Sequence, residues 1–224
     1  MSRLRDSQGA GAPLGLIGGT FDPVHFGHLR LAEEARTALG LAGVRWIPAG
    51  RPPHRDTPAV PPECRLEMVR LAIDGNPAFQ LDDAEVRAAA PSYTVVTLER
   101  LRGELGPARP LVLLLGADAF LGLPTWMRWR EIFELAHVAV ASRPGFELTA
   151  AHMAEPLARE YGARQVAAPA ALAGRPAGGI IRFSITPLGV SATGIRELVG
   201  RNGSPRYLLP DPVLAYIQTH QLYR

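Results

Sequence analysis

Lysine is absent from this chain of 224 residues, so all 24 of its Lys/Arg cations are arginines. This absence excludes a Schiff-base lysine, a Walker-type lysine and any lysine-based phosphate loop. A phosphate ligand would have to be bound by arginine, histidine, backbone N–H groups, hydroxyls or a metal ion. The arginines are spread along the chain rather than gathered in a block, so we predict no binding of nucleic acid.

Cysteine and long apolar runs are also scarce. Cys64 is the one cysteine, which excludes an intrachain disulfide and argues against a cysteine-built zinc site. No apolar run approaches the roughly 18–20 residues of a membrane helix, and residues 1–13 lack the hydrophobic core of a signal peptide. We therefore expect a cytoplasmic protein with no membrane association, in which residues 1–13 are disordered and residues 14–224 form a single domain.

Strand-like and helix-like segments alternate along the chain. The expected strands are Leu14–Ile17, Val44–Ile47, Leu111–Leu115, Val138–Ala141 and Ile180–Ile185. The expected helices are Gly27–Leu39, Pro62–Ile73, Thr94–Leu105, Ala151–Tyr161, Ser191–Val199 and Pro212–His220. This order predicts an α/β fold, a Rossmann-like, doubly wound parallel sheet with helices on both faces and a small C-terminal helical segment. In such sheets ligands bind at the carboxyl ends of the strands.

The segment from Gly18 to His28 has the most distinctive pattern, a glycine turn between an apolar strand and an amphipathic helix. Such a turn directs backbone N–H groups and the positive end of a helix dipole at one point, which suits a phosphate. His25 and His28 are three residues apart, so they share one helix face and could donate hydrogen bonds to phosphate oxygens. The alternative is a tight turn followed by two surface histidines.

Two motifs together resemble the nucleotidyltransferase superfamily. His25-Phe26-Gly27-His28 matches its His-x-Gly-His signature, and Val-Ser-Ala-Thr-Gly-Ile-Arg at residues 190–196 is similar to its second signature, Ile-Ser-x-Thr-x-x-Arg. Within the superfamily the chain most resembles the bacterial nicotinate-nucleotide adenylyltransferase family, from about Leu14 to Arg224. Four further segments carry that resemblance: Pro-Pro-His-Arg at 52–55, Pro-Ser-Tyr-Thr at 91–94, Gly-Ala-Asp at 116–118 and Pro-Thr-Trp at 124–126.

The resemblance implies a definite reaction with two substrates, ATP and nicotinate mononucleotide. The phosphate of the mononucleotide attacks the α-phosphorus of ATP in line, pyrophosphate leaves, and deamido-NAD forms for NAD biosynthesis. Because the nucleophile is already an anion, catalysis should consist of positioning and charge stabilisation. Mg²⁺ is expected on the ATP phosphates, with no protein metal site; Asp22 could be a water-mediated metal contact or a turn-forming residue. Self-association into a homo-oligomer is left open.

Three residues carry the catalytic roles that the resemblance implies. His25 and His28 would contact the ATP phosphates, and Arg196 would reach the β- or γ-phosphate with its planar fork. Ser191 should both N-cap its helix and help to hold phosphate. Asp118 resembles an acidic residue near the ATP ribose, and helix N-capping is its alternative. The other implied ATP-binding residues are Gly18, Gly19, Thr20, Phe21, Gly116, Val190 and Thr193.

The acceptor residues are also implied by the resemblance. Trp126 would stack on the nicotinate ring, with ordinary core packing as its alternative. Tyr93 and Thr94 would meet the pyridine carboxylate, although the same residues could be a plain helix start. Met127 stands where many relatives have an aromatic residue, and its backbone N–H could still serve the carboxylate. The remaining implied residues are anion-binding candidates: His54, Arg55 and Arg143, of which Arg143 could equally be a solvated surface arginine.

Three alternative functions remain open from the sequence. One is another adenylyl- or cytidylyltransferase whose acceptor is phosphopantetheine or glycerol phosphate. A second is the same enzyme acting on nicotinamide mononucleotide, since the sequence separates carboxylate from carboxamide poorly. A third is a non-catalytic nucleotide-binding or redox module, which the absence of a Gly-x-Gly-x-x-Gly pattern in the first turn disfavours.

Overall fold

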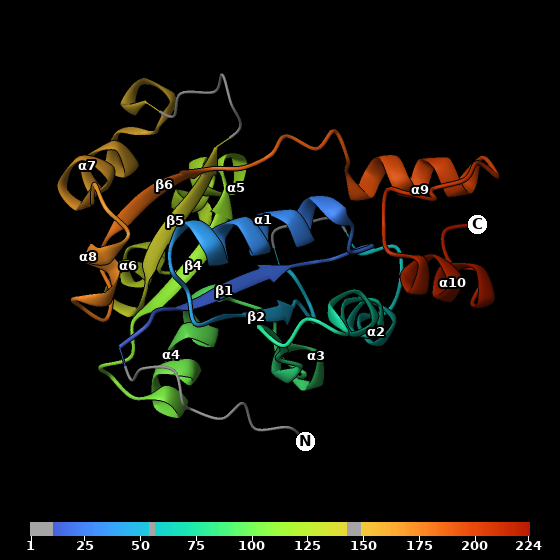
Figure 1. The fold of residues 1–224 in the computed structure, drawn as a ribbon, viewed down its shortest axis with the longest axis horizontal. Coiled ribbons are helices and arrows are strands. Elements are labelled where there is room, and N and C mark those ends of the chain that lie inside the picture. The colour runs from blue at the N-terminus through green and yellow to red at the C-terminus, as the bar shows by residue number, and fades with distance from the viewer. Residues whose placement is uncertain (1–10, 54–56, 143–148) are drawn as a thin grey trace.

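Six parallel strands form one sheet in the order β3-β2-β1-β4-β5-β6 (Figure 1). The computed structural model describes residues 11–53, 57–142 and 149–224. The strands are β1 (Leu14–Gly19), β2 (Gly43–Pro48), β3 (Phe79–Leu81), β4 (Leu111–Gly116), β5 (His137–Ser142) and β6 (Ile180–Ser184). This strand order is that of dinucleotide-binding doubly wound sheets, so the predicted Rossmann-like fold is confirmed.

Helices connect successive strands, as a parallel sheet requires. The α-helices are α1 (Phe26–Ala38), α2 (Pro62–Ile73), α3 (Ala84–Arg87), α4 (Thr94–Leu105), α5 (Ala117–Leu121), α6 (Ile132–Leu135), α7 (Glu155–Arg164), α8 (Ala170–Ala173), α9 (Ala192–Gly200) and α10 (Asp211–Thr219). Short 3₁₀ turns are η1 (Leu123–Thr125), η2 (Trp129–Glu131) and η3 (Ala150–His152). Within the described ranges, every helix is too short or too polar to span a bilayer.

The central strands are apolar on both sides because each side packs against a layer of helices. Along β4, Val112 and Leu114 belong to one core cluster, whereas Leu113 and Leu115 belong to the other. Since successive side chains in a strand point to opposite faces, the two clusters are the two faces of the sheet.

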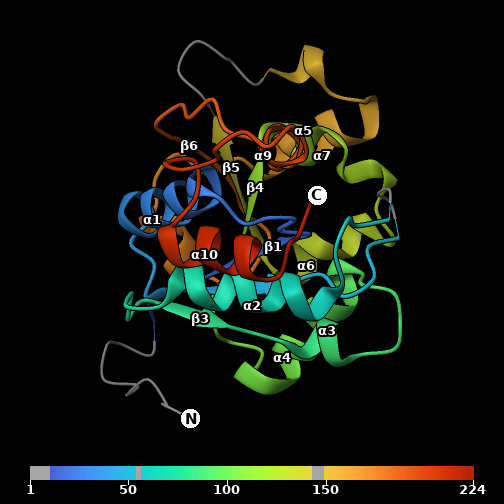
Figure 2. The ribbon, with the colours of Figure 1, turned by 90° about the vertical axis from the view of Figure 1, so that its right-hand side faces the viewer.

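Two helical layers cover the two faces (Figures 1 and 2). Buried residues of α1, α2 and α10 share the first cluster with the strands, and α10 lies alongside α2 in Figure 2. Buried residues of α4, α6 and α7 share the second cluster. The predicted C-terminal helical segment is thus present as α9 and α10, with α10 built into the first layer.

Some expected elements have different bounds in the structure. β3 was not among the expected strands, because an edge strand of three residues is too short to show a period. The helix expected over Ala151–Tyr161 begins at Glu155, with Pro156 in its first turn, where proline is tolerated. The short helix α8 was not among the expected helices. Disorder was predicted for residues 1–13, and residues 1–10 lie outside the described part of the chain.

Candidate active site

The first loop of the site joins β1 to α1. β1 ends at Gly19, Phe21 takes a left-handed backbone conformation with a φ of 50°, and α1 begins at Phe26. His25 is the N-cap residue of α1, with extended backbone angles. The N–H of Phe26 donates to the carbonyl oxygen of Leu208 at 3.1 Å and that of His28 to the carbonyl oxygen of His25 at 3.0 Å. The start of α1 therefore contributes mainly the positive end of its helix dipole to the site.

The two histidines of this loop lie directly against each other. Their rings stack with centroids 3.8 Å apart and planes inclined by 26°. The backbone N–H of His25 donates to Nδ1 of His28 at 3.3 Å, so a neutral His28 carries its proton on Nε2. Phe21 supports the pair from behind, with its ring edge-on to His28 at 5.1 Å. The prediction that both imidazoles share one face is confirmed.

His25 is almost fully buried, with 7% of its surface exposed. Burial lowers the pKa of His25 to about 4, so near neutral pH it is an uncharged hydrogen-bond donor. Its Nδ1 atom is buried and has no hydrogen-bond partner among the described residues. A Cβ at Gly27 would lie 3.0 Å from that Nδ1 and 3.3 Å from Cγ1 of Val190. A side chain larger than that of glycine would therefore crowd the ring and require its neighbours to shift.

The side chain of Asp22 connects the first loop, through hydrogen bonds, to two segments that are distant in the sequence. Its Oδ2 accepts a hydrogen bond from the backbone N–H of Ala59 at 2.7 Å, and its Oδ1 accepts one from the hydroxyl of Tyr223 at 2.7 Å. Burial and the hydrogen bond to Asp22 raise the pKa of Tyr223. Asp22 is only 5% exposed and both partners are distant in the sequence, so its side chain anchors the loop rather than closing a local turn. The water-mediated metal contact stays a prediction.

The second motif lies at the start of α9. Oγ of Ser191 accepts the backbone N–H of Gly194 at 3.1 Å, so the predicted N-cap is confirmed. Arg196 donates from Nη1 to the carbonyl oxygen of Asp22 at 2.7 Å and from Nη2 to Oγ1 of Thr193 at 3.3 Å. The guanidinium of the second motif is therefore attached to the loop of the first, although 174 residues separate the bonded pair.

A cavity of about 320 Å³ opens at the carboxyl ends of the central strands, beside the start of α1. It is lined by side chains and backbone that follow β1, β4 and β6. Predicted residues on its wall are His25, His28, Gly116, Asp118 and Val190, and the others include Gly27, Leu31 and Thr186. Thr186 is held in place by Glu34 of α1, whose carboxylate accepts its N–H at 2.7 Å and its hydroxyl at 2.6 Å.

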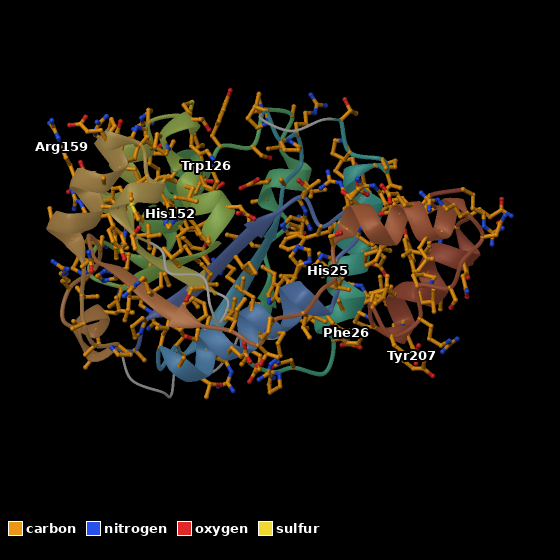
Figure 3. The ribbon with its side chains drawn as sticks, turned by 90° about the horizontal axis from the view of Figure 1, so that it is seen from above. His25, Phe26, Trp126, His152, Arg159 and Tyr207 are labelled. Carbon is orange, nitrogen blue, oxygen red and sulfur yellow. The ribbon has the colours of Figure 1, made fainter. Side chains whose placement is uncertain are left out.

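A second cavity, of about 370 Å³, lies beside the first. Its wall is mainly apolar, and it includes predicted residues from both halves of the site: Gly18, Gly19, Thr20, Tyr93, Thr94, Asp118, Trp126 and Met127. Figure 3 shows Trp126 among the helices that follow β4, away from His25 at the start of α1. Trp126 packs partly against the second core cluster and also faces this cavity.

Asp118 lines both cavities, so they meet at the start of α5. The N-cap of α5 is Gly116 rather than Asp118, and the N-capping alternative for Asp118 is therefore wrong. Gly18, Gly19 and Thr20, which are predicted to bind ATP, line the wall of the Trp126 cavity.

Some predicted residues are not on a cavity wall. The side chain of Phe21 is 2% exposed and packs against His28 and Trp46, so its contribution is to support the histidine pair. His54, Arg55 and Arg143 lie outside the described residues.

Two charged residues of the site were not predicted. Glu85 lines the Trp126 cavity and accepts the hydroxyl of Thr97 at 2.5 Å, and burial raises the pKa of its carboxyl group. Arg65 is fully buried beneath the first loop. A signal for it exists in the sequence, because Arg65 occupies the same helical face as the apolar Met68 and Val69.

In the ranges that the structure describes, no group of three or more His, Cys, Asp or Glu side chains is placed to hold a metal ion. The side-chain donors on the wall of the smaller cavity are instead the imidazoles of His25 and His28, and Arg196 is hydrogen-bonded to the same loop through Asp22. Such donors suit an anionic ligand with several oxygen atoms.

Comparisons with known proteins agree with this geometry. The family model described as cytidylyltransferase-like matches residues 16–198. A protein of Dechloromonas aromatica named as a probable nicotinate-nucleotide adenylyltransferase is 63% identical over 212 residues, covering 95% of this chain and 98% of that protein. A protein of Halorhodospira halophila with the same name is 52% identical over 200 residues, covering 89% and 90% of the two chains.

Solved structures share the fold. Plasmodium falciparum nicotinic acid mononucleotide adenylyltransferase complexed with NaAD superposes with a TM-score of 0.71, covering 95% of this chain and 97% of that chain. The same enzyme complexed with APC gives a TM-score of 0.68. Sequence identity is 14% in both cases, so these structural matches support only the assignment of the fold.

Proposed function

The chain belongs to the nicotinate-nucleotide adenylyltransferase family, and from this premise we propose how its two cavities divide the substrates. It is a nucleotidyltransferase of NAD biosynthesis, which transfers the adenylyl group of ATP to nicotinate mononucleotide and releases pyrophosphate. The observation that carries the proposal is the pair of cavities that meet at Asp118, one lined by imidazoles and the other by an indole.

ATP occupies the smaller cavity, with its phosphates at the start of α1. His25 and His28 supply imidazole N–H donors, and the helix start adds positive dipole charge. Arg196 is held beside this loop by its bond to Asp22, and its remaining N–H groups are available to a phosphate oxygen. Asp118, at the junction of the two cavities, accepts hydrogen bonds from the ribose.

Nicotinate mononucleotide occupies the larger cavity. Trp126 and Tyr93 provide aromatic surfaces for the flat pyridine ring. Thr94 is the first residue of α4, so its backbone N–H has no carbonyl partner within the helix and can serve the pyridine carboxylate. We expect a second N–H from Met127, whose side chain also lines this wall.

The reaction is a single displacement at phosphorus. An oxygen of the mononucleotide phosphate forms a bond to the α-phosphorus of ATP, and the bond from that phosphorus to the bridging oxygen of the leaving diphosphate breaks. The nucleophile is already an anion, so no side chain has to remove a proton. His25, His28 and Arg196 donate hydrogen bonds where negative charge accumulates; one such preorganised donor contributes on the order of 3–4 kcal/mol.

We propose that Mg²⁺ enters with the ATP phosphates and neutralises charge on the leaving diphosphate. The residues fit this arrangement, because the buried carboxylate of Asp22 already accepts two hydrogen bonds and the smaller cavity offers donors for phosphate oxygens. A cytoplasmic location stays a prediction from the sequence, and self-association into a homo-oligomer stays open.

Pyrophosphate release from Mg-ATP tests the proposal with three acceptors in parallel: nicotinate mononucleotide, nicotinamide mononucleotide and phosphopantetheine. We expect strong preference for the first. Equal or better release with the amide would contradict the roles of Thr94 and Met127, and release with phosphopantetheine would contradict the role of Trp126. No release with any of the three would contradict the reaction itself.

A further inference from the structure

Arg65 joins the two loops that follow β1 and β2. It lies on α2, is 0% exposed, and donates only to backbone carbonyl oxygens among the described residues. Nη1 donates to Thr20 at 2.8 Å and to Ala49 at 2.6 Å, and Nη2 donates to Gly50 at 2.9 Å. One guanidinium therefore ties the carboxyl ends of two adjacent strands together.

The segments that it ties are a wall of the larger cavity. Thr20 and Ala49 both line that cavity. Gly50 is fixed from the opposite side as well, since its backbone N–H donates to Oγ of Ser92 at 2.9 Å. A Cβ on Gly50 would overlap the carbonyl oxygen of Glu85. The wall is thus held between Ser92 and Glu85 on one side and Arg65 on the other.

The charge of Arg65 is not matched by a carboxylate of its own. Asp22 has the largest electrostatic effect on it of any acidic group, but both carboxylate oxygens of Asp22 are engaged by Ala59 and Tyr223. Burial lowers the pKa of Arg65, and its Nε is buried without a partner among the described residues. Burying a charge on neutral partners costs stability relative to an apolar side chain of similar size. Packing alone therefore does not account for an arginine at this position.

We propose that Arg65 is a positioning residue for adenylyl transfer, holding the Thr20 and Ala49 loops at the spacing that a phosphorylated acceptor requires. Its rigid fork reaches carbonyls of both loops at once, which the single ammonium of a lysine does not reproduce. Its charge also lies beneath a site for two phosphorylated substrates and favours their binding at a distance. The inference rests on the proposed function but gives Arg65 no direct contact with substrate.

Two substitutions at Arg65 and one matched control test this inference. Arg65→Lys keeps the charge and loses the fork, whereas Arg65→Met loses both. Arg70→Met is the control, because Arg70 lies on the same helix, is exposed and, in the part of the chain that the structure describes, pairs only with Glu67. For each protein we would measure the folded fraction by circular dichroism, kcat and KM for both substrates, and the Kd of nicotinate mononucleotide by calorimetry.

We expect folded Arg65→Lys to lose about 100-fold in kcat, the effect of a displacement of about 1 Å at the reacting atoms. Its Kd for nicotinate mononucleotide should rise roughly tenfold, and Arg70→Met should match the wild type in both.

Wild-type kcat and Kd in folded Arg65→Lys would overturn the inference, as would a loss of folded protein with unchanged kcat per folded molecule. If Arg65→Met does not fold, Arg65→Lys decides alone. Wild-type protein that binds the mononucleotide without releasing pyrophosphate would overturn the proposed function, and the Kd comparison would still decide the role of Arg65.

Discussion

Replacing Gly27 by alanine should increase the helix propensity at the start of α1 and at the same time crowd the His25 ring. Gly27 is the second residue of α1, and alanine in a helix is favoured over glycine by up to about 1 kcal/mol. The added Cβ would lie 3.0 Å from Nδ1 and from Cε1 of His25. That approach is closer than a relaxed contact, so the His25 ring must turn away or the helix start must move.

Helix propensity and crowding change the free energy of unfolding, whereas the position of the His25 ring changes kcat. Crowding in a packed site costs roughly 1–3 kcal/mol, which the helix gain partly offsets, so the free energy of unfolding should fall by less than about 2 kcal/mol. The displaced imidazole no longer stands where charge develops, and removing one preorganised donor lowers kcat by about 100- to 1,000-fold. Gly27→Ala should therefore be a folded protein with very low activity.

The assay is pyrophosphate release with saturating Mg-ATP and nicotinate mononucleotide, together with urea unfolding. Gly103→Ala is the matched control, since Gly103 lies in α4 and a Cβ there meets nothing within 4 Å. The control should gain stability and keep its kcat. A Gly27→Ala protein with wild-type kcat would refute the assignment of His25 to the phosphate site.

Three further predictions follow from individual residues. Ser191→Ala removes the N-cap of α9 and should lower the free energy of unfolding by about 1 kcal/mol in urea titration; an unchanged midpoint would contradict the cap. Trp126→Ala should raise KM for nicotinate mononucleotide roughly tenfold and leave KM for ATP unchanged; an equal rise in both would contradict the division of the cavities. The pKa of His25 is lowered to about 4 by burial, so the unfolded chain binds this proton more tightly than the folded one. Stability from the neutral imidazole should be complete above pH 6.5 and fall by about 3 kcal/mol as the pH drops from 6.5 through 4. Urea unfolding across this range should show a shallower pH dependence for His25→Asn than for the wild type; identical slopes would contradict the burial of His25.

The features that depend on periodicity and on neighbouring residues could be predicted from the sequence. Apolar strands such as Leu111–Leu115 and amphipathic helices between them suffice for a parallel sheet. The stacking of His25 on His28 follows from their spacing on one helix face. Even the meeting of the first and second motifs could be expected, because both follow strands of one sheet.

The features that depend on long-range contacts could not be predicted. Asp22 is anchored by Ala59 and Tyr223, and no local pattern in the sequence indicates those partners. Arg65 has polar partners only because three carbonyl groups meet at its helix once the sheet has formed. The grouping of Thr20 with the Trp126 cavity likewise depends on how the loops fold over the strand ends.

The most direct test of the central claim is to identify the products formed from Mg-ATP and nicotinate mononucleotide whose phosphate carries heavy oxygen. Mass spectrometry of both products shows which phosphorus is attacked. Direct attack on the α-phosphorus predicts a dinucleotide that retains all the label and pyrophosphate that carries none. Label in the pyrophosphate, or no dinucleotide at all, would contradict the account.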